Sequence, residues 1–245
     1  GNDTVNTLRL WEARSPEGFD LKLFNDQTYL QASAKAVQAE DISRVLYPND
    51  TEKDGKQLRL KQQFFFTSAS LQDIIRRYKS VFGNDFSKFA DKVAIQLNDT
   101  HPVVAIPELM RIFLDKEKLG WDEAWNICKN VFAYTNHTIL SEALEKWDIS
   151  LFQPLLPRAY QIIEEINRRF IAELQQKYPE DWERINKMSI IGNGQVRMAW
   201  LAIVGSHKVN GVAALHTEIL KNSELKEWNE LYPEKFLNKT NGITQ

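Results

Sequence analysis

The sequence is poor in cysteine, in net charge and in long apolar runs. Cys128 is the single cysteine among 245 residues, which excludes a disulfide framework and a metal site built from several cysteines. With Lys+Arg 31 against Asp+Glu 33, the formal net charge is −2, so there is no excess of basic residues for nucleic acid. The longest uninterrupted apolar run spans residues 198–204, whereas a membrane-crossing helix needs about 20 such residues. No basic segment followed by an apolar one opens the sequence, so we expect a soluble, cytoplasmic protein that binds neither nucleic acid nor a membrane.

Signature motifs of metal and nucleotide sites are also absent from the sequence. The histidines show no H-E-x-x-H arrangement, so no zinc site is predicted. The segment GNGQVR (residues 192–197) resembles a dinucleotide-binding loop, but Arg197 stands where that pattern requires Gly or Ala. A Rossmann-like nucleotide-binding protein is therefore the weakest of the hypotheses considered. Cys128 lies on an apolar helical face and is predicted to be a buried thiol.

Short apolar runs alternate with longer stretches of helical periodicity along the chain. We expect strands over residues 4–13, 93–97, 131–134 and 188–191. We expect helices over residues 25–40 and starting near residues 58, 107, 121, 158, 198 and 212. This alternation predicts an α/β fold, with a Rossmann-like, mostly parallel sheet flanked by helices in one domain. Ligands of such sheets bind outside the carboxyl ends of the strands, which is where functional residues should lie.

The motif NDTHP (residues 98–102) directly follows one predicted strand. Asp99 and His101 are two residues apart, so they could hold a polar ligand or shift each other's pKa. The same residues also suit a structural turn, since Asn and Asp turn the chain and Pro102 stiffens it. The spacing alone leaves both interpretations open and favours the structural one.

The motif TNHT (residues 135–138) follows the next predicted strand and precedes a predicted helix. Glu142 and Glu145 are three residues apart, which would place both carboxylates on one helical face for acid–base chemistry or simply in solvent. His137 is the stronger candidate, because a loop of Asn, His and Thr suits the recognition of hydroxyl groups. Neither motif alone identifies a function, but the order of such motifs along the chain can be compared with known families.

A succession of ordered blocks resembles the α-glucan phosphorylases, the family of glycogen, starch and maltodextrin phosphorylases. The blocks are RVLYPND (44–50), LRLKQQF (58–64), LQDIIRR (71–77), QLNDTHPVVAIPELMR (96–111), FAYTNHTILSEALEKW (132–147), LLPRAYQIIEEINRRF (155–170), VNGVAALHTEIL (209–220) and KFLNKTNGIT (235–244). They cover essentially the whole chain from Val5 onward, and several exceed ten residues.

The resemblance implies a fold and a reaction. The family consists of glycosyltransferases of the GT-B type, whose active site lies between two Rossmann-like halves, and this chain resembles part of the N-terminal, glucan-binding half. The implied reaction is reversible phosphorolysis of the terminal α-1,4-linked glucosyl unit of a glucan by inorganic phosphate, giving glucose 1-phosphate. The implied cofactor is pyridoxal phosphate, whose Schiff-base lysine belongs to a Gly-Asn-Met-Lys segment that does not occur in this sequence. The family resemblance also implies a homodimer for the intact protein.

The resemblance assigns roles to individual residues. His137 would be the catalytic residue, because its side chain would hydrogen-bond the 6-hydroxyl of the reacting glucosyl unit while its carbonyl faces the developing positive charge. Asn49 and Asp50 match a mobile loop that gates the site, and Gly211 allows close approach of the backbone to the sugar. The implied substrate-binding residues are Asn241, Asn49, Asp50, Asp99, His101, Thr138, Glu145, Asn210, Gly211 and Val212.

Two consequences follow for the isolated chain. Without the cofactor lysine we expect it to lack phosphorylase activity, and an uncovered cleft surface should favour poor solubility or self-association. The alternative hypothesis is a non-catalytic module of the same fold that binds maltooligosaccharides. Selective binding of an α-1,4-linked sugar would favour that alternative.

Overall fold

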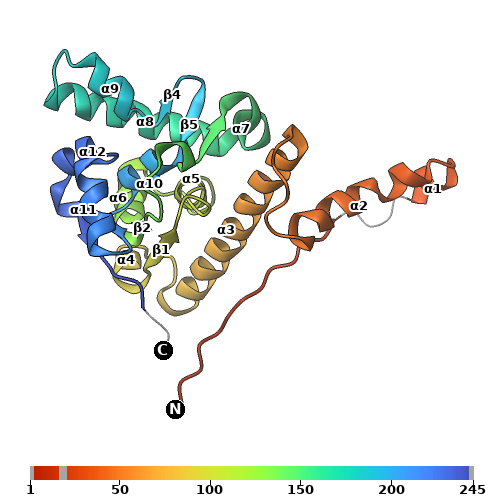
Figure 1. Cartoon of the computed structure of the whole chain (residues 1–245). Coiled ribbons are helices and arrows are strands. Elements are labelled where there is room, and N and C mark those ends of the chain that lie inside the picture. The colour runs from red at the N-terminus through yellow and green to blue at the C-terminus, as the bar shows by residue number, and fades with distance from the viewer. Residues whose placement is uncertain (1–2, 17–20, 243–245) are drawn as a thin grey trace. The chain divides into compact units, whose positions relative to one another are not determined.

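The computed structural model describes residues 3–16 and 21–242 (Figure 1). The chain divides into two compact units, one up to Ala69 and one from Ser70 onward. Helix α3 (Lys53–Phe82) contributes its first part to the former and its last part to the latter. The α/β architecture expected from the sequence lies in the second unit, because no described residue of the first unit belongs to a strand.

The first unit is helical where it has regular structure. It contains α1 (Leu21–Asn25), α2 (Tyr29–Arg44) and the start of α3. The expected helix over residues 25–40 is formed as α2, although it begins and ends four residues later. The expected strand over residues 4–13 is wrong: Leu8 and Leu10 are each 85% exposed and the segment has no regular structure. Apolar alternation makes a strand only where a neighbouring strand satisfies its backbone, and none is present among the described residues of this unit.

The second unit is built on a parallel sheet of four strands in the order β1-β2-β6-β7. The strands are β1 (Ile95–Asn98), β2 (Phe132–Thr135), β6 (Lys208–Gly211) and β7 (Phe236–Asn238). Leu97 pairs with Tyr134, and Tyr134 with Val209, so one row of buried side chains crosses three strands. The strands expected over 93–97 and 131–134 are confirmed within one or two residues at each end.

Helices connect the strands of this sheet. Helix α4 (Phe89–Lys92) precedes β1, whereas α5 (Ala105–Arg111), the π-helical turn η1 (Ile112–Lys116) and α6 (Trp121–Val131) lie between β1 and β2. Those between β6 and β7 are α11 (Ala214–Asn222), α12 (Lys226–Leu231) and the 3₁₀ turn η3 (Pro233–Lys235). Cys128 of α6 is fully buried, which confirms the predicted buried thiol, and burial raises the pKa of this thiol.

A longer insertion joins β2 to β6. It contains the 3₁₀ turn η2 (Ser141–Ala143), β3 (Lys146–Asp148), α7 (Ile149–Leu155), α8 (Pro157–Lys177), α9 (Trp182–Met188), β4 (Ile191–Gly192), β5 (Gln195–Arg197) and α10 (Met198–Gly205). Strands β3, β5 and β4 form a separate antiparallel sheet. Helix α8 buries the apolar stripe expected of it, which comprises Ile162, Ile163, Ile166, Phe170 and Leu174.

The segment around GNGQVR corrects one expectation. The strand expected over 188–191 is wrong, since Met188 ends α9 and Ile191 belongs to the short β4–β5 hairpin. Asn193 and Gly194 have φ angles of 53° and 72°, the left-handed pair that a tight hairpin turn requires. Arg197 donates to the carbonyls at the end of α9, those of residues 186, 187 and 189, at 2.9–3.0 Å. The arginine that breaks the nucleotide pattern therefore caps a helix.

No helix among the described residues combines the length and apolar character needed to cross a membrane.

Candidate functional site

Polar side chains gather where the four parallel strands end. The register aligns Asn98 with Thr135, and Thr135 with Asn210, so the last residues of β1 and β2 lie beside the third residue of β6. Since the strands run parallel, the NDTHP and TNHT motifs leave the sheet at the same edge. This carboxyl edge is where the sequence predicted ligand-binding residues.

A hydrogen-bond network crosses three of the strands at this edge. Gln96 Nε2 donates to Thr135 Oγ1 at 2.7 Å, and Thr135 Oγ1 donates to Asn210 Oδ1 at 2.9 Å. The His137 ring, through Nε2, is hydrogen-bonded to Asn98 Oδ1. Two of the predicted site residues, His137 and Asn210, thus belong to one polar surface on neighbouring strands.

Asn136 fixes the course of the loop that carries His137. Its side chain is 1% exposed, with Nδ2 donating to the Tyr134 hydroxyl at 3.3 Å and Oδ1 accepting from the Thr138 N–H at 3.0 Å. Its backbone N–H donates to the Asn210 carbonyl at 2.9 Å. The loop is therefore anchored on both sides of His137, which itself is exposed. The signal for Asn136 in the sequence is its position directly after an apolar strand.

The structure favours the turn interpretation of Asp99. Its φ of 66° is left-handed, its backbone N–H donates to the Thr135 carbonyl at 2.9 Å, and its carboxylate accepts from the Thr100 N–H at 2.6 Å. His101 begins the turn that leads into α5 and is half-buried. Asp99 contacts the first residue of the TNHT motif through its backbone, and a ligand contact stays a prediction for Asp99 and His101.

The loop after β6 is closely packed. A Cβ on Gly211 would lie 2.4 Å from Thr217 Oγ1 and 2.7 Å from His216 Nδ1, so only glycine fits there. The Val212 N–H donates to His216 Nδ1 at 3.2 Å, and the Asn241 N–H donates to the Val212 carbonyl at 3.0 Å. The structure therefore brings Gly211, Val212 and Asn241 together, and their contact with a sugar stays a prediction.

His216 is a site residue that the sequence interpretation missed. Because Nδ1 accepts from Val212, the proton of the neutral ring is on Nε2, which is buried without a hydrogen-bond partner among the described residues. Burial, followed by the charge of nearby His137, lowers the pKa of His216 below its ordinary value of 6.5. The signal in the sequence was a histidine four residues after Val212, in the first turn of a helix that begins beside the glycine loop.

The expected helix bearing Glu142 and Glu145 is wrong. The chain forms the single 3₁₀ turn η2, and β3 begins directly after Glu145 because it pairs with β5. Glu145 Oε1 accepts from Trp147 Nε1 at 3.2 Å, while Glu142 is exposed on the 3₁₀ turn. The two carboxylates are therefore not a pair on one helical face.

Asn49 and Asp50 belong to the first compact unit, whereas the strands of the carboxyl edge belong to the second. Asp50 forms an ion pair with Arg59 of α3, and Asn49 Oδ1 accepts from the Thr51 N–H at 3.0 Å. A Cβ on Gly55 would lie 1.9 Å from the Asn49 carbonyl oxygen, so a glycine is required where α3 passes beneath this loop. The part of the chain that the structure describes holds no group of three or more His, Cys, Asp or Glu residues arranged for a metal ion.

Comparison with known proteins supports the sequence resemblance. The sequence model of the family described as carbohydrate phosphorylase matches residues 1–245. The chain is 54% identical to the liver form of glycogen phosphorylase from Homo sapiens and 55% identical to the muscle form from Mus musculus. It is also 54% identical to the brain form from Rattus norvegicus. Each alignment covers 99% of this chain but only 30% of the relative, so the chain spans about 30% of the length of these relatives.

Proposed function

Since the chain belongs to the carbohydrate phosphorylase family, we propose that the protein containing it catalyses reversible phosphorolysis of terminal α-1,4-linked glucosyl units, giving glucose 1-phosphate. The proposed part played by this chain is to hold the reacting glucosyl unit. One observation carries the proposal: at the carboxyl edge, His137 is hydrogen-bonded to Asn98 and Thr135 to Asn210, between the ends of adjacent strands. Such an edge suits a ligand rich in hydroxyl groups, such as a glucan.

His137 is the proposed catalytic residue. Asn98 Oδ1 can only accept a hydrogen bond, so His137 Nε2 donates to it and Nδ1 is the acceptor of the neutral ring. That nitrogen would accept a hydrogen bond from the 6-hydroxyl of the sugar, and Asn241 would contact the same hydroxyl. Loss of a buried hydrogen bond costs about 1–3 kcal/mol, which corresponds to roughly a ten- to hundredfold slower step.

The other proposed sugar contacts surround this loop. Thr138, Asp99, His101 and Glu145 are proposed to line the side below the sugar ring, and Val212 to approach it through its backbone. Support comes from the anchoring of the loops themselves, because Asn136 and His216 hold both loops in fixed positions. Asn49 and Asp50 are proposed to gate the site.

The cofactor proposed for the whole protein is pyridoxal phosphate, which supplies acid–base chemistry toward inorganic phosphate when bound. A Schiff base needs a lysine beside the cofactor. Lys239 follows β7 at the carboxyl edge but is exposed, and the half-buried Lys235 precedes β7 at the opposite end of the strand and donates to the Ile203 carbonyl. Neither of these two lysines is therefore placed to hold the cofactor at the carboxyl edge.

The proposed partners are an α-1,4-glucan, inorganic phosphate and a second copy of the whole protein, and the proposed location is the cytoplasm. The test is to incubate the full-length protein with maltodextrin and phosphate and to measure glucose 1-phosphate. His137→Ala should lower the rate by about ten- to hundredfold, whereas Asn222→Ala, on the exposed end of α11, should not. Absence of product from the unmodified protein would overturn the proposal.

The isolated chain gives a second test. We expect no glucose 1-phosphate from it, but its carboxyl edge is complete within the second compact unit, which also suits the alternative of a maltooligosaccharide-binding module. Titration with maltopentaose, with cellopentaose as the control, separates the possibilities. Selective binding that His137→Ala weakens would support a glucosyl site in this chain alone. Equal behaviour of both sugars would mean that this chain alone does not form the site.

A further inference from the structure

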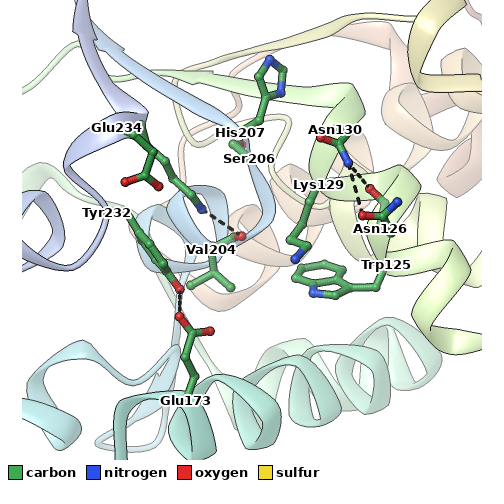
Figure 2. A pocket seen from close by; sticks show the side chains of 11 residues that line it. Trp125, Asn126, Lys129, Asn130, Glu173, Val204, Ser206, His207, Tyr232 and Glu234 are labelled. Carbon is green, nitrogen blue, oxygen red and sulfur yellow. Dashed lines mark hydrogen bonds between the residues drawn. The ribbon is translucent and has the colours of Figure 1, made fainter. Parts of the chain in front are cut away.

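A cavity of about 390 Å³ lies at the amino ends of the parallel strands (Figure 2). Its lining residues Ser206 and His207 directly precede β6, Lys235 directly precedes β7, and Asn130 closely precedes β2. A four-residue strand separates its two ends by about 10 Å, so this cavity is distinct from the carboxyl edge. Its volume lies in the range typical of small-molecule sites.

Two ammonium groups line this cavity without carboxylate partners. Lys129 Nζ lies 5.9 Å from the centre of the Trp125 ring, and Lys235 Nζ lies 4.1 Å from the centre of the Tyr232 ring. Figure 2 shows Lys129 reaching over the Trp125 indole. Within the described residues neither ammonium forms an ion pair, and each lies against an aromatic face. Burial, followed by the charge of Lys129, lowers the pKa of Lys235 to about 8, so an anion bound between the two lysines would stabilise their charged forms.

Of the two carboxylates that line the cavity, one accepts a hydrogen bond and the other is exposed to solvent. Glu173, from α8, accepts from the Tyr232 hydroxyl at 2.6 Å, a contact visible in Figure 2. Glu234 is exposed to solvent. Lys235 donates to the carbonyls of Ile203 and Val204 at 2.9 and 3.5 Å, which covers the negative end of α10 with an ammonium group. Of the two carboxylates in the lining, one therefore already accepts a hydrogen bond and the other lies in solvent, whereas both ammonium groups lack a carboxylate within ion-pair distance among the described residues.

Uncharged hydrogen-bond donors also line the cavity. Ser206 is 0% exposed, and its Oγ has no hydrogen-bond partner among the described residues. Asn126 accepts from Asn130 through its carbonyl at 2.8 Å and its side-chain oxygen at 3.4 Å, so its amide presents N–H groups. A buried hydroxyl without a partner is costly, and a ligand oxygen is one way to satisfy it.

From this geometry we propose that the cavity binds a phosphate group, either as inorganic phosphate or as a small phosphate monoester, between Lys129 and Lys235. Two ammonium groups match the charge of a phosphate dianion, and its several oxygens can also accept from Ser206 and Asn126. A sugar stacked on Trp125 or Tyr232 fits less well, because an ammonium group already lies over each ring. The room left beyond a phosphate group suits the remainder of a monoester.

The test is protection of the two lysines from an amine-acylating reagent, quantified by mass spectrometry on the full-length protein. The probes are inorganic phosphate and glycerol 2-phosphate, each against sodium chloride at matched ionic strength. At about ten times the dissociation constant, labelling of Lys129 and Lys235 should fall about tenfold, since the free fraction is 1/(1 + [L]/Kd). Labelling of Lys221, on α11, is the internal reference.

Two variants make the test specific. Ser206→Ala should weaken phosphate protection several-fold without lowering the melting temperature, because the hydroxyl has no hydrogen-bond partner in the described part of the chain. Lys129→Met should weaken protection of Lys235, whereas Lys187→Met, which removes a lysine paired with Glu227 outside the cavity, should not.

The outcomes are distinct. Protection by both probes supports a site for a phosphate group, and protection by phosphate alone supports the proposal with inorganic phosphate as the occupant. Unprotected lysines with both probes, or equal protection in Lys129→Met, would overturn it. Because the readout is lysine labelling, the result is independent of the proposed phosphorylase activity.

Discussion

The imidazole of His137 and the side-chain oxygen of Asn98 are hydrogen-bonded across the ends of two adjacent parallel strands. The contact orients the catalytic candidate before any ligand is present. Because the His137 ring already occupies one rotamer, sugar binding does not carry the entropy cost of fixing that rotamer.

Removing this orienting contact should impair the reaction more than the fold. Asn98 is exposed, so Asn98→Ala should leave the free energy of unfolding nearly unchanged. The rate of glucose 1-phosphate formation by the full-length protein should fall by about tenfold or more, because the His137 ring loses its partner. Asn222→Ala is the matched control. A normal rate in Asn98→Ala would show that the ring is oriented by something else.

His216 should act as a positioning residue for the loop after β6. In His216→Leu the Val212 N–H loses its acceptor, whereas the amide oxygen of His216→Gln can replace Nδ1. We expect the dissociation constant for maltopentaose to rise about tenfold in the leucine variant, and the glutamine variant to recover part of the loss. If both variants bind alike, the ring serves packing and not the loop.

The lowered pKa of His216 also predicts a pH dependence of stability. The unfolded chain takes up a proton on this residue as the pH falls below about 6.5, whereas the folded protein resists protonation until a lower pH. The stability contribution is therefore complete above pH 6.5 and is lost as the pH falls through the window below it. Urea unfolding between pH 7.5 and 5 should show a smaller loss in His216→Gln than in the unmodified protein. Equal slopes would contradict the assignment.

Gly211→Ala should be strongly destabilising. The added Cβ would approach Thr217 Oγ1 to 2.4 Å and the Thr217 Cα to 3.0 Å, and the backbone atom cannot rotate away. Such overpacking costs about 1–3 kcal/mol in the free energy of unfolding, measurable by urea denaturation. Gly120→Ala is the matched control, because a Cβ there meets no atom within 4 Å. A similar midpoint for both variants would show that the loop relaxes.

Local pattern was sufficient for part of the fold and failed where pairing is non-local. The strand around Leu97 and the polar motif that follows it were predictable, since a short run containing the β-branched residues Val93 and Ile95 followed by turn residues carries its own signal. The helix expected around Glu142 does not form, because residues 146–148 pair with β5 about fifty positions later. No periodicity within the segment reports that partner.

In the candidate site, too, some residues were predictable from the local sequence and others were not. His137 could be named from its loop, whereas His216 acquires its role only through the Val212 N–H and the glycine against which it packs. Ser206 likewise looks like an ordinary residue before a strand, and only its burial without a partner marks it. Roles that depend on contacts between elements were beyond the reach of the sequence.

The insertion between β2 and β6 delays the pairing of these two strands while the chain is being synthesised on the ribosome. Asn98 and His137 are synthesised early, but the strand that holds Asn210 follows only after the whole of η2 to α10. Closing so long a loop costs conformational entropy, and this cost is offset only when the contacts between β2 and β6 have formed. A nascent chain therefore carries an open sheet edge through much of its synthesis, and a pause or truncation before residue 208 would leave that edge free to pair with another chain.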